Sequence, residues 1–241
     1  MTNHGSGGER PLFSLAPGRH FDETVYDDVR DELKRKGWSS IAHTFDVEDG
    51  TKSLDDHAKQ MAIAEEESGA GSVVRVGWSW GANVAIRKLY NAHVTKIILP
   101  AGAFDPNSLA WLDDPVPKTD HSVHYGAYEN NSEKAAEDLI RTCLLTDISD
   151  EDIILSWARN LRPHPRRKDE PPLYKTPAPP IDYIRLLRDK AILNQPEIAR
   201  ALQKKKKRNV TILDFASDHM PMVSHPREFT QLLINRAMES S

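Results

Sequence analysis

The sequence predicts an α/β fold with a mostly parallel central sheet of about six strands and helices on both faces. Short strand-type segments alternate with amphipathic segments over most of the chain, and a Gly-x-Ser-x-Gly turn joins one strand directly to a helix. Strands that are separated by helices pair in parallel, so this alternation is typical of a sheet between two helical layers. The length of 241 residues suits one such domain with an insertion.

The strands are expected where β-branched and other apolar residues form short runs. The run at 73–76 reads Val-Val-Arg-Val and ends at Gly77. The expected strands are 12–16, 39–45, 73–76, 94–99, 181–187 and 209–215.

The helices are expected where apolar residues recur at helical spacing. Apolar residues recur every four positions from Val25 to Leu33, which predicts a helix that ends at Gly37. Ser53 precedes Asp56 by three residues, and this spacing resembles a capping box at the start of a helix. Further helices are expected directly after Ser79 and at 53–68, 132–143, 150–160, 195–203 and 225–238.

One stretch interrupts the alternation of strands and helices. Residues 106–180 hold ten of the sixteen prolines, charged helical pieces and no clear strand. Apolar residues such as Trp157 give this stretch something to bury, so we expect a cap insertion over the carboxyl edge of the sheet rather than a linker. Residues 11–105 and 181–241 are then the core, and residues 1–10 are expected to be a disordered tail.

Composition argues against several classes of partner. The net charge is −4 and the isoelectric point is about 6.2, so no overall field attracts nucleic acid or a membrane surface. The basic run at 204–208 is interpreted as a solvated helix end. No apolar run approaches ~18 residues, and the single cysteine, Cys143, suits a reducing compartment. We expect a cytoplasmic protein, and a homodimer is compatible with the sequence.

The Gly-x-Ser-x-Gly turn predicts a nucleophile elbow. In that turn the serine is held in a strained backbone conformation, and the residues two before and two after it must be small. Gly77 and Gly81 meet this requirement around Ser79. The alternative is a glycine-lined turn that has no catalytic role. A histidine and a carboxylate elsewhere in the chain are needed to distinguish the two.

A serine nucleophile needs a histidine base, and the histidine needs a carboxylate behind it. His219 is the histidine that follows a late strand by four residues. Asp189 follows the 181–187 strand by two residues and is the preferred acid, with pairing to a neighbouring cation as its alternative role. Asp214, Asp218 and Asp105 are the rivals for that position.

An oxyanion that forms on serine attack needs two backbone N–H donors. We expect one from Trp80, directly after the nucleophile, and the other from the turn after the first strand, at Gly18 and Arg19. The alternative for that turn is a simple connection between strand and helix. No metal or other cofactor is expected, because His121 and His124 are spaced like a metal pair without a cluster of carboxylates.

The full chain resembles the α/β-hydrolase superfamily, in particular its small capped esterases, which include plant methylesterases and hydroxynitrile lyases. The motifs that carry the resemblance are the elbow at 77–81, the segment 183–192 and the segment 217–226, together with Leu-Arg-Pro-His-Pro at 161–165 in the insertion. The resemblance implies the α/β-hydrolase fold, with the acid at Asp189, the base at His219 and an oxyanion donor at Arg19.

The sequence departs from that family at several positions around the expected site. Pro17 stands in place of a histidine, Arg19 in place of a small residue, Trp78 in place of a histidine, and Ala82 in place of a second glycine. The resemblance implies a lysine directly after the base in the cyanohydrin lyases, whereas this chain has Met220, as in the esterases.

We therefore expect a carboxylesterase-type serine hydrolase whose substrate is a small-molecule ester with a small, largely apolar acyl part. Two alternatives stay open: a non-catalytic binder of small ligands on the same fold, and an enzyme like the hydroxynitrile lyases. The residues expected to line the substrate pocket, with packing of the cap as the competing role for the middle three, are Trp78, Trp111, Trp157, Tyr174 and Met220.

Overall fold

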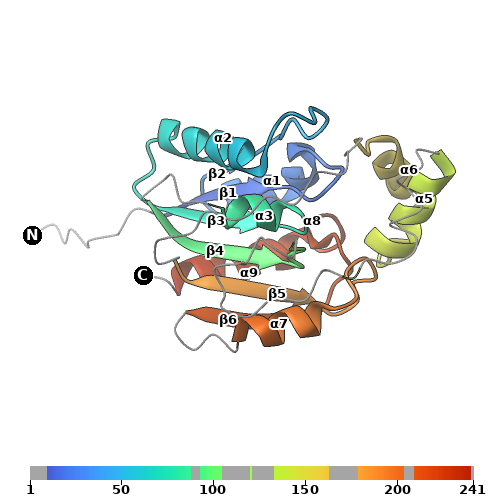
Figure 1. The fold of residues 1–241 in the computed structure, drawn as a ribbon. Coiled ribbons are helices and arrows are strands. Elements are labelled where there is room, and N and C mark those ends of the chain that lie inside the picture. The colour runs from blue at the N-terminus through green and yellow to red at the C-terminus, as the bar shows by residue number, and fades with distance from the viewer. Residues whose placement is uncertain are drawn as a thin grey trace, which may run out of the picture.

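The computed structural model describes residues 10–87, 93–104, 120, 133–162, 179–203 and 209–239. Its centre is a six-stranded, fully parallel sheet in the order β2-β1-β3-β4-β5-β6 (Figure 1). The predicted fold class is therefore confirmed. The strands are β1 (Leu12–Ala16), β2 (Ser40–Ala42), β3 (Val73–Gly77), β4 (Val94–Pro100), β5 (Ile181–Leu186) and β6 (Val210–Phe215).

Helices cover both faces of this sheet. On one face α1 and α9 pack on strand residues such as Val74 and Val76, and on the other face α3 and α7 pack on residues such as Val73. Successive residues of β3 thus face opposite cores, and all five of its residues are buried. The helices are η1 (Glu23–Tyr26), α1 (Asp27–Arg35), α2 (Leu54–Glu67), α3 (Gly81–Ala85), α5 (Glu133–Leu139), η2 (Ile140–Leu144), α6 (Glu151–Arg159), α7 (Gln195–Gln203), α8 (Pro221–Ser224) and α9 (Pro226–Met238).

Local sequence signals explain several helix ends. Ser53 and Asp56 form the expected reciprocal capping box at the start of α2. Gly37 follows α1 with a φ of 76°, a backbone conformation that glycine adopts without steric cost. Asp150 caps α6 by accepting hydrogen bonds from the backbone N–H groups of Asp152 and Ile153.

Some element bounds differ from the expected ones. The strand predicted over 39–45 is only Ser40–Ala42, because Phe45 leaves the sheet and packs against α2 and α3. The first helix begins as the 3-10 turn η1, and the helix predicted over 132–143 ends in the π-helical turn η2. The last helix is preceded by the short helix α8, with Pro226 at the start of α9.

The helices α5 and α6 lie beyond the carboxyl ends of the strands (Figure 1). We call residues 133–162 the helical insertion, since they occur between β4 and β5 in the chain. At its end, the Arg162 backbone N–H donates to the His20 carbonyl and the His20 Nδ1–H donates to the Arg162 carbonyl, both at 2.8 Å. This double contact holds the insertion against the turn after β1. Within the described part of the chain, no helix is long and apolar enough to cross a membrane.

Candidate active site

Ser79 occupies a strained turn between β3 and α3. Its φ is 51°, in the left-handed region that is unfavourable for residues other than glycine. Backbone hydrogen bonds hold the turn: the Ser79 N–H donates to the Pro100 carbonyl at 3.1 Å, and its carbonyl accepts from Ala103 at 3.0 Å. Ser79 thus has the conformation of a nucleophile elbow at the carboxyl end of β3.

The two glycines of the motif are required by close packing. A Cβ atom on Gly77 would lie 2.7 Å from the Ala85 Cβ, and one on Gly81 would lie 2.4 Å from the Pro17 carbonyl oxygen. Real Cβ atoms do not approach other atoms so closely, so a side chain at either position would displace α3 from the sheet. The small residues of the motif therefore bring α3 up against the end of β1.

The turn after β1 lies next to the elbow. Gly18 is buried, and a Cβ atom there would lie 2.8 Å from the Trp78 ring. Arg19 is half-buried, and His20 follows with a φ of 72°. Trp80 packs its side chain against Phe45 and begins α3 with a helical backbone conformation. The segments expected to supply oxyanion donors are thus neighbours at one edge of the sheet.

The imidazole of His219 is hydrogen-bonded to the carboxylate of Asp189. The His219 Nδ1–H donates to Asp189 Oδ2 at 2.7 Å, and the two side chains are 2% and 0% exposed. The two residues follow β5 and β6, which are paired neighbours in the sheet, so their loops emerge side by side. This bond occupies Nδ1 of the imidazole and leaves Nε2 as its second ring nitrogen.

Asp189 is itself fixed by three further N–H donors. Its Oδ1 accepts from the backbone N–H groups of Ala191 at 2.7 Å and Ile192 at 3.2 Å, and its Oδ2 accepts from the side-chain amide of Gln195 at 2.7 Å. The Gln195 amide oxygen accepts from the Leu186 N–H at 2.9 Å, which ties it to the end of β5. The sequence indicated Gln195 only as the start of a helix. Its position six residues after Asp189 was the one sequence feature that could have pointed to this contact.

Trp78 connects the elbow to the histidine loop. Its indole N–H donates to the His219 carbonyl at 2.7 Å, and the two rings lie 5.3 Å apart between centroids. Trp78 and Met220, both expected in the substrate pocket, are 1% and 0% exposed and belong to the core of the α1 and α9 face. Trp78 thus contacts the backbone of the expected base.

Trp157 lies in a different setting from these two. It is half-buried, packs 5.9 Å from Phe21 between ring centroids, and lines an open groove of about 500 Å³ with Val25 and Val223. The other pocket expectations, Trp111 and Tyr174, lie outside the described residues, as do Asp105, His121, His124 and the basic run 204–208.

Two of the rivals of Asp189 have other partners. Asp214 forms a two-bonded ion pair with Arg185 at 2.6 Å, and Asp218 accepts hydrogen bonds from Ser224 and from backbone groups. Among the described residues, no three His, Cys, Asp or Glu side chains form a group that could hold a metal ion.

Comparison with known proteins finds solved structures of similar fold. Similar solved structures include an Arabidopsis methylesterase with a TM-score of 0.69 at 16% identity, covering 95% of this chain and 99% of the other. A pyrethroid hydrolase from Sphingobium faniae has a TM-score of 0.65 at 18% identity, covering 95% and 97%. An extracellular α/β-hydrolase from a Paenibacillus species has a TM-score of 0.66 at 14% identity, covering 93% and 98%.

At these identities the likeness concerns the fold. No curated protein sequence matched the chain. A family model described as the alpha/beta hydrolase family matches residues 2–232. The resemblance drawn from the elbow and the two later motifs is thereby confirmed, and the chain belongs to the alpha/beta hydrolase family.

Proposed function

We propose that the protein is a serine hydrolase that cleaves a small carboxylic ester through an acyl-enzyme. The observation that carries the proposal is the 2.7 Å hydrogen bond from His219 to the buried carboxylate of Asp189, at the same edge of the sheet as the strained Ser79. Membership of the alpha/beta hydrolase family and the name of the similar Arabidopsis methylesterase support an ester substrate.

In the proposed reaction, Ser79 Oγ attacks the ester carbonyl carbon while His219 Nε2 accepts the hydroxyl proton. Asp189 keeps the Nδ1–H of His219 in place and stabilises the imidazolium that forms. The tetrahedral intermediate expels the alcohol, which takes the proton from His219. Water then attacks the acyl-enzyme with His219 again as base, and the carboxylic acid leaves with Ser79 restored.

The backbone N–H groups of Trp80 and Arg19 are proposed to stabilise the oxyanion, with Gly18 letting the chain approach the substrate. A single donor of this kind contributes about 10²–10³ in kcat in serine hydrolases. We further propose that the helical insertion is part of a cap that covers this edge and makes it apolar, which suits an ester with a small, apolar acyl part.

Replacement of the nucleophile tests the proposal. Ser79→Ala should reduce kcat for ester hydrolysis by about 10⁶-fold, because the acyl-enzyme can no longer form. Hydrolysis of a panel of short-chain and aromatic methyl esters is measured by release of acid. Ser39→Ala, at an exposed serine next to the amino end of β2, is the matched control and should leave the rate unchanged.

A fluorophosphonate probe gives a second measurement on the same proteins. The wild type should be labelled at Ser79, and the label should disappear in Ser79→Ala and after denaturation. Ester turnover that persists in Ser79→Ala would contradict the assignment. A wild type that neither turns over esters nor takes the label would point to the non-catalytic binder.

A further inference from the structure

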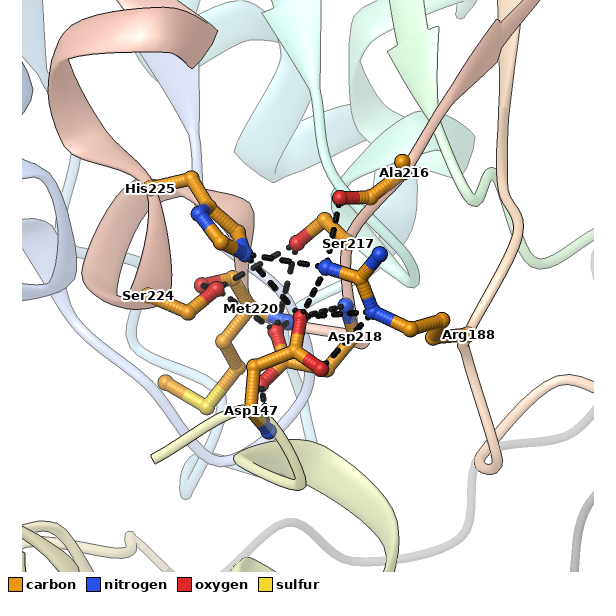
Figure 2. Close-up of polar contacts among 8 residues, drawn as sticks. All are labelled: Asp147, Arg188, Ala216, Ser217, Asp218, Met220, Ser224 and His225. Atoms are coloured by element: carbon orange, nitrogen blue, oxygen red, sulfur yellow. Dashed lines mark hydrogen bonds and ion pairs between the residues drawn. The ribbon is translucent and has the colours of Figure 1, made fainter. Parts of the chain in front are cut away.

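A cluster of polar side chains joins the helical insertion to the loops that carry Asp189 and His219. Asp147 lies at the centre of the cluster and comes from the insertion, shortly after η2 ends at Leu144 (Figure 2). We call the group the Asp147 cluster. Its members are Asp147, Arg188, Ser217, Asp218, Ser224 and His225.

The Asp147 carboxylate binds the side chain of the residue before the expected acid through both of its oxygens. Arg188 Nε donates to Asp147 Oδ1 at 2.9 Å and Nη2 donates to Oδ2 at 2.7 Å, so the guanidinium forms a two-bonded fork. The same Nη2 donates to the Ala216 carbonyl at 2.7 Å, and the Arg188 backbone N–H donates to the Ser217 carbonyl at 2.9 Å. Arg188 directly precedes Asp189, so this fork limits how the loop after β5 can move.

The Oδ2 atom of the same carboxylate also binds the residue before the expected base. The Asp218 backbone N–H donates to Asp147 Oδ2 at 2.9 Å, and the Asp147 backbone N–H donates to Asp218 Oδ2 at 3.0 Å. Asp218 Oδ1 in turn accepts from the Met220 N–H at 3.1 Å and from Ser224 Oγ at 2.8 Å. Asp218 and Met220 flank His219, so these bonds fix the backbone on both sides of the imidazole.

The electrostatic interactions of the cluster also involve Asp147 most directly. The arginine fork lowers the pKa of Asp147 to about 2, with contributions from His225, whose Nε2 lies 3.0 Å from Asp147 Oδ2, and from the Asp218 N–H. Burial raises the pKa of Asp218, and the charge on Asp147 contributes in the same direction. The side chain of Asp147 is 15% exposed, whereas the Arg188 side chain that forks onto it is 46% exposed.

We propose that Asp147 is a positioning residue for the acid–base pair. Its one carboxylate binds the residue before Asp189 and the residue before His219, so the docking of the helical insertion and the alignment of the two side chains are coupled. This inference rests on the proposed function for its effect on rate, whereas the alignment can be measured without any substrate.

The test variant is Asp147→Asn. An asparagine keeps the size of the side chain but has no charge and only one acceptor oxygen. Because Arg188 Nε donates to Oδ1 and Arg188 Nη2 and the Asp218 N–H donate to Oδ2, the amide N–H₂ group must face one of these donors, so the fork and the Asp218 contact cannot both be kept intact. We expect kcat to fall by about 10- to 100-fold with KM changed by less than about threefold, because misalignment affects the transition state more than binding. Glu151→Gln is the matched control. It removes a carboxylate that pairs with Arg141 within the insertion, at 2.6 Å, and should leave kcat unchanged.

Alignment is read from the NMR signal of the proton on His219 Nδ1. A proton that is held between an imidazole and a buried carboxylate resonates at low field, and His219→Gln assigns it by its loss. The signal should be present in the wild type and in Glu151→Gln, and it should be broadened or lost in Asp147→Asn. This signal would distinguish a positioning role from a general loss of stability in a variant that is still folded.

The outcomes separate the two proposals. A wild type without esterase activity contradicts the proposed function, and the His219 signal then decides the positioning role alone. If Asp147→Asn does not fold, Arg188→Lys, which keeps the charge but loses the fork, should show the same change in smaller measure. A folded Asp147→Asn or Arg188→Lys with the kcat and the His219 signal of the wild type would overturn the inference, as would absence of the signal from the wild type.

Discussion

Two arginine–carboxylate pairs contact the elements that carry the candidate active site, and they differ in how far their side chains are exposed to solvent. Arg75 of β3 donates to Glu65 of α2 through Nε at 2.8 Å and Nη2 at 2.7 Å, and both side chains are 0% exposed. Arg188 forms the same kind of fork to Asp147, but its side chain is 46% exposed. The first pair lies between sheet and helix, and the second lies between the helical insertion and the loops after β5 and β6.

The difference in solvent exposure suggests different roles for the two pairs. Arg75 also donates to the Ala85 carbonyl at 3.4 Å, so the buried pair supports the helix that follows Ser79. A charge in such a place is expensive to leave unpaired, because no water replaces its partner. The half-exposed pair is cheaper to break but adjoins both members of the proposed acid–base pair. We therefore expect the buried pair to affect mainly folding and the half-exposed pair to affect mainly chemistry.

The largest effect is expected from breaking the buried pair. Glu65→Gln leaves the charge of Arg75 buried without a carboxylate and should lower the free energy of unfolding by about 3–5 kcal/mol. Urea unfolding followed by tryptophan fluorescence measures this loss. The double variant Glu65→Leu with Arg75→Met removes both charges and should recover most of it.

A loss in Glu65→Gln that is no larger than the loss in Asp147→Asn would remove the distinction between the two pairs. The distinction would also fail if Glu65→Gln were stable but reduced kcat as strongly as Asp147→Asn.

A second prediction concerns acid, and it depends on His43 beside the buried pair. Burial lowers the pKa of His43 from 6.5 to about 4, with Glu65 acting in the opposite direction. The unfolded chain therefore binds a proton between pH 6.5 and 4 that the folded protein does not take up, so stability falls as the pH falls through this window. The loss should reach about 3 kcal/mol near pH 4.

Urea unfolding of the wild type and of His43→Gln, at a series of pH values between 7 and 4, checks this dependence. The variant should lack this part of the slope. Equal slopes in the two proteins would show that the polar environment of His43, which includes Ser14 Oγ at 2.8 Å, accommodates the charged imidazole.

The smallest effect is expected at Trp78. Trp78→Phe keeps an aromatic ring beside Gly18 but leaves the His219 carbonyl without its indole donor. We expect kcat to fall by about fivefold, since one hydrogen bond contributes about 1 kcal/mol. Trp38→Phe, at a buried tryptophan that packs 5.4 Å from Phe13, is the control and should keep the wild-type kcat. Equal rates in the two variants would mean that the indole bond does not position His219.

Much of the fold could be predicted from the sequence because its signals are local. The six strands, the capping box at Ser53 and the glycines around Ser79 each depend on neighbouring residues. The ends of strands and helices were less predictable where tertiary packing determines them. Phe45 is an example, because it leaves the sheet and packs in a separate hydrophobic cluster. The order of strands along the chain also led to the pairing of Asp189 with His219, whose catalytic roles stay predictions.

The supporting contacts of the site could not be predicted in the same way. Asp147 is 41 residues from Arg188 and 71 from Asp218, and Trp78 is 141 from His219. No periodicity or spacing links such positions, so only the folded chain brings them together. Trp78 and Met220 were expected in the substrate pocket because they adjoin the expected nucleophile and base, and the structure shows that both are buried in the core. Sequence alone does not separate these two settings, since aromatic and apolar residues suit both, and the pocket role stays a prediction.

The position of the Trp78 ring has a consequence for how sequences of this kind can change. The ring fills the space that a side chain on residue 18 would need, and its N–H serves the backbone of residue 219. A smaller residue at 78 would open room for a larger one at 18 and would require a new donor for the histidine loop. Positions 18 and 78 should therefore co-vary among related chains, with the contacts of residue 219 adjusting alongside them.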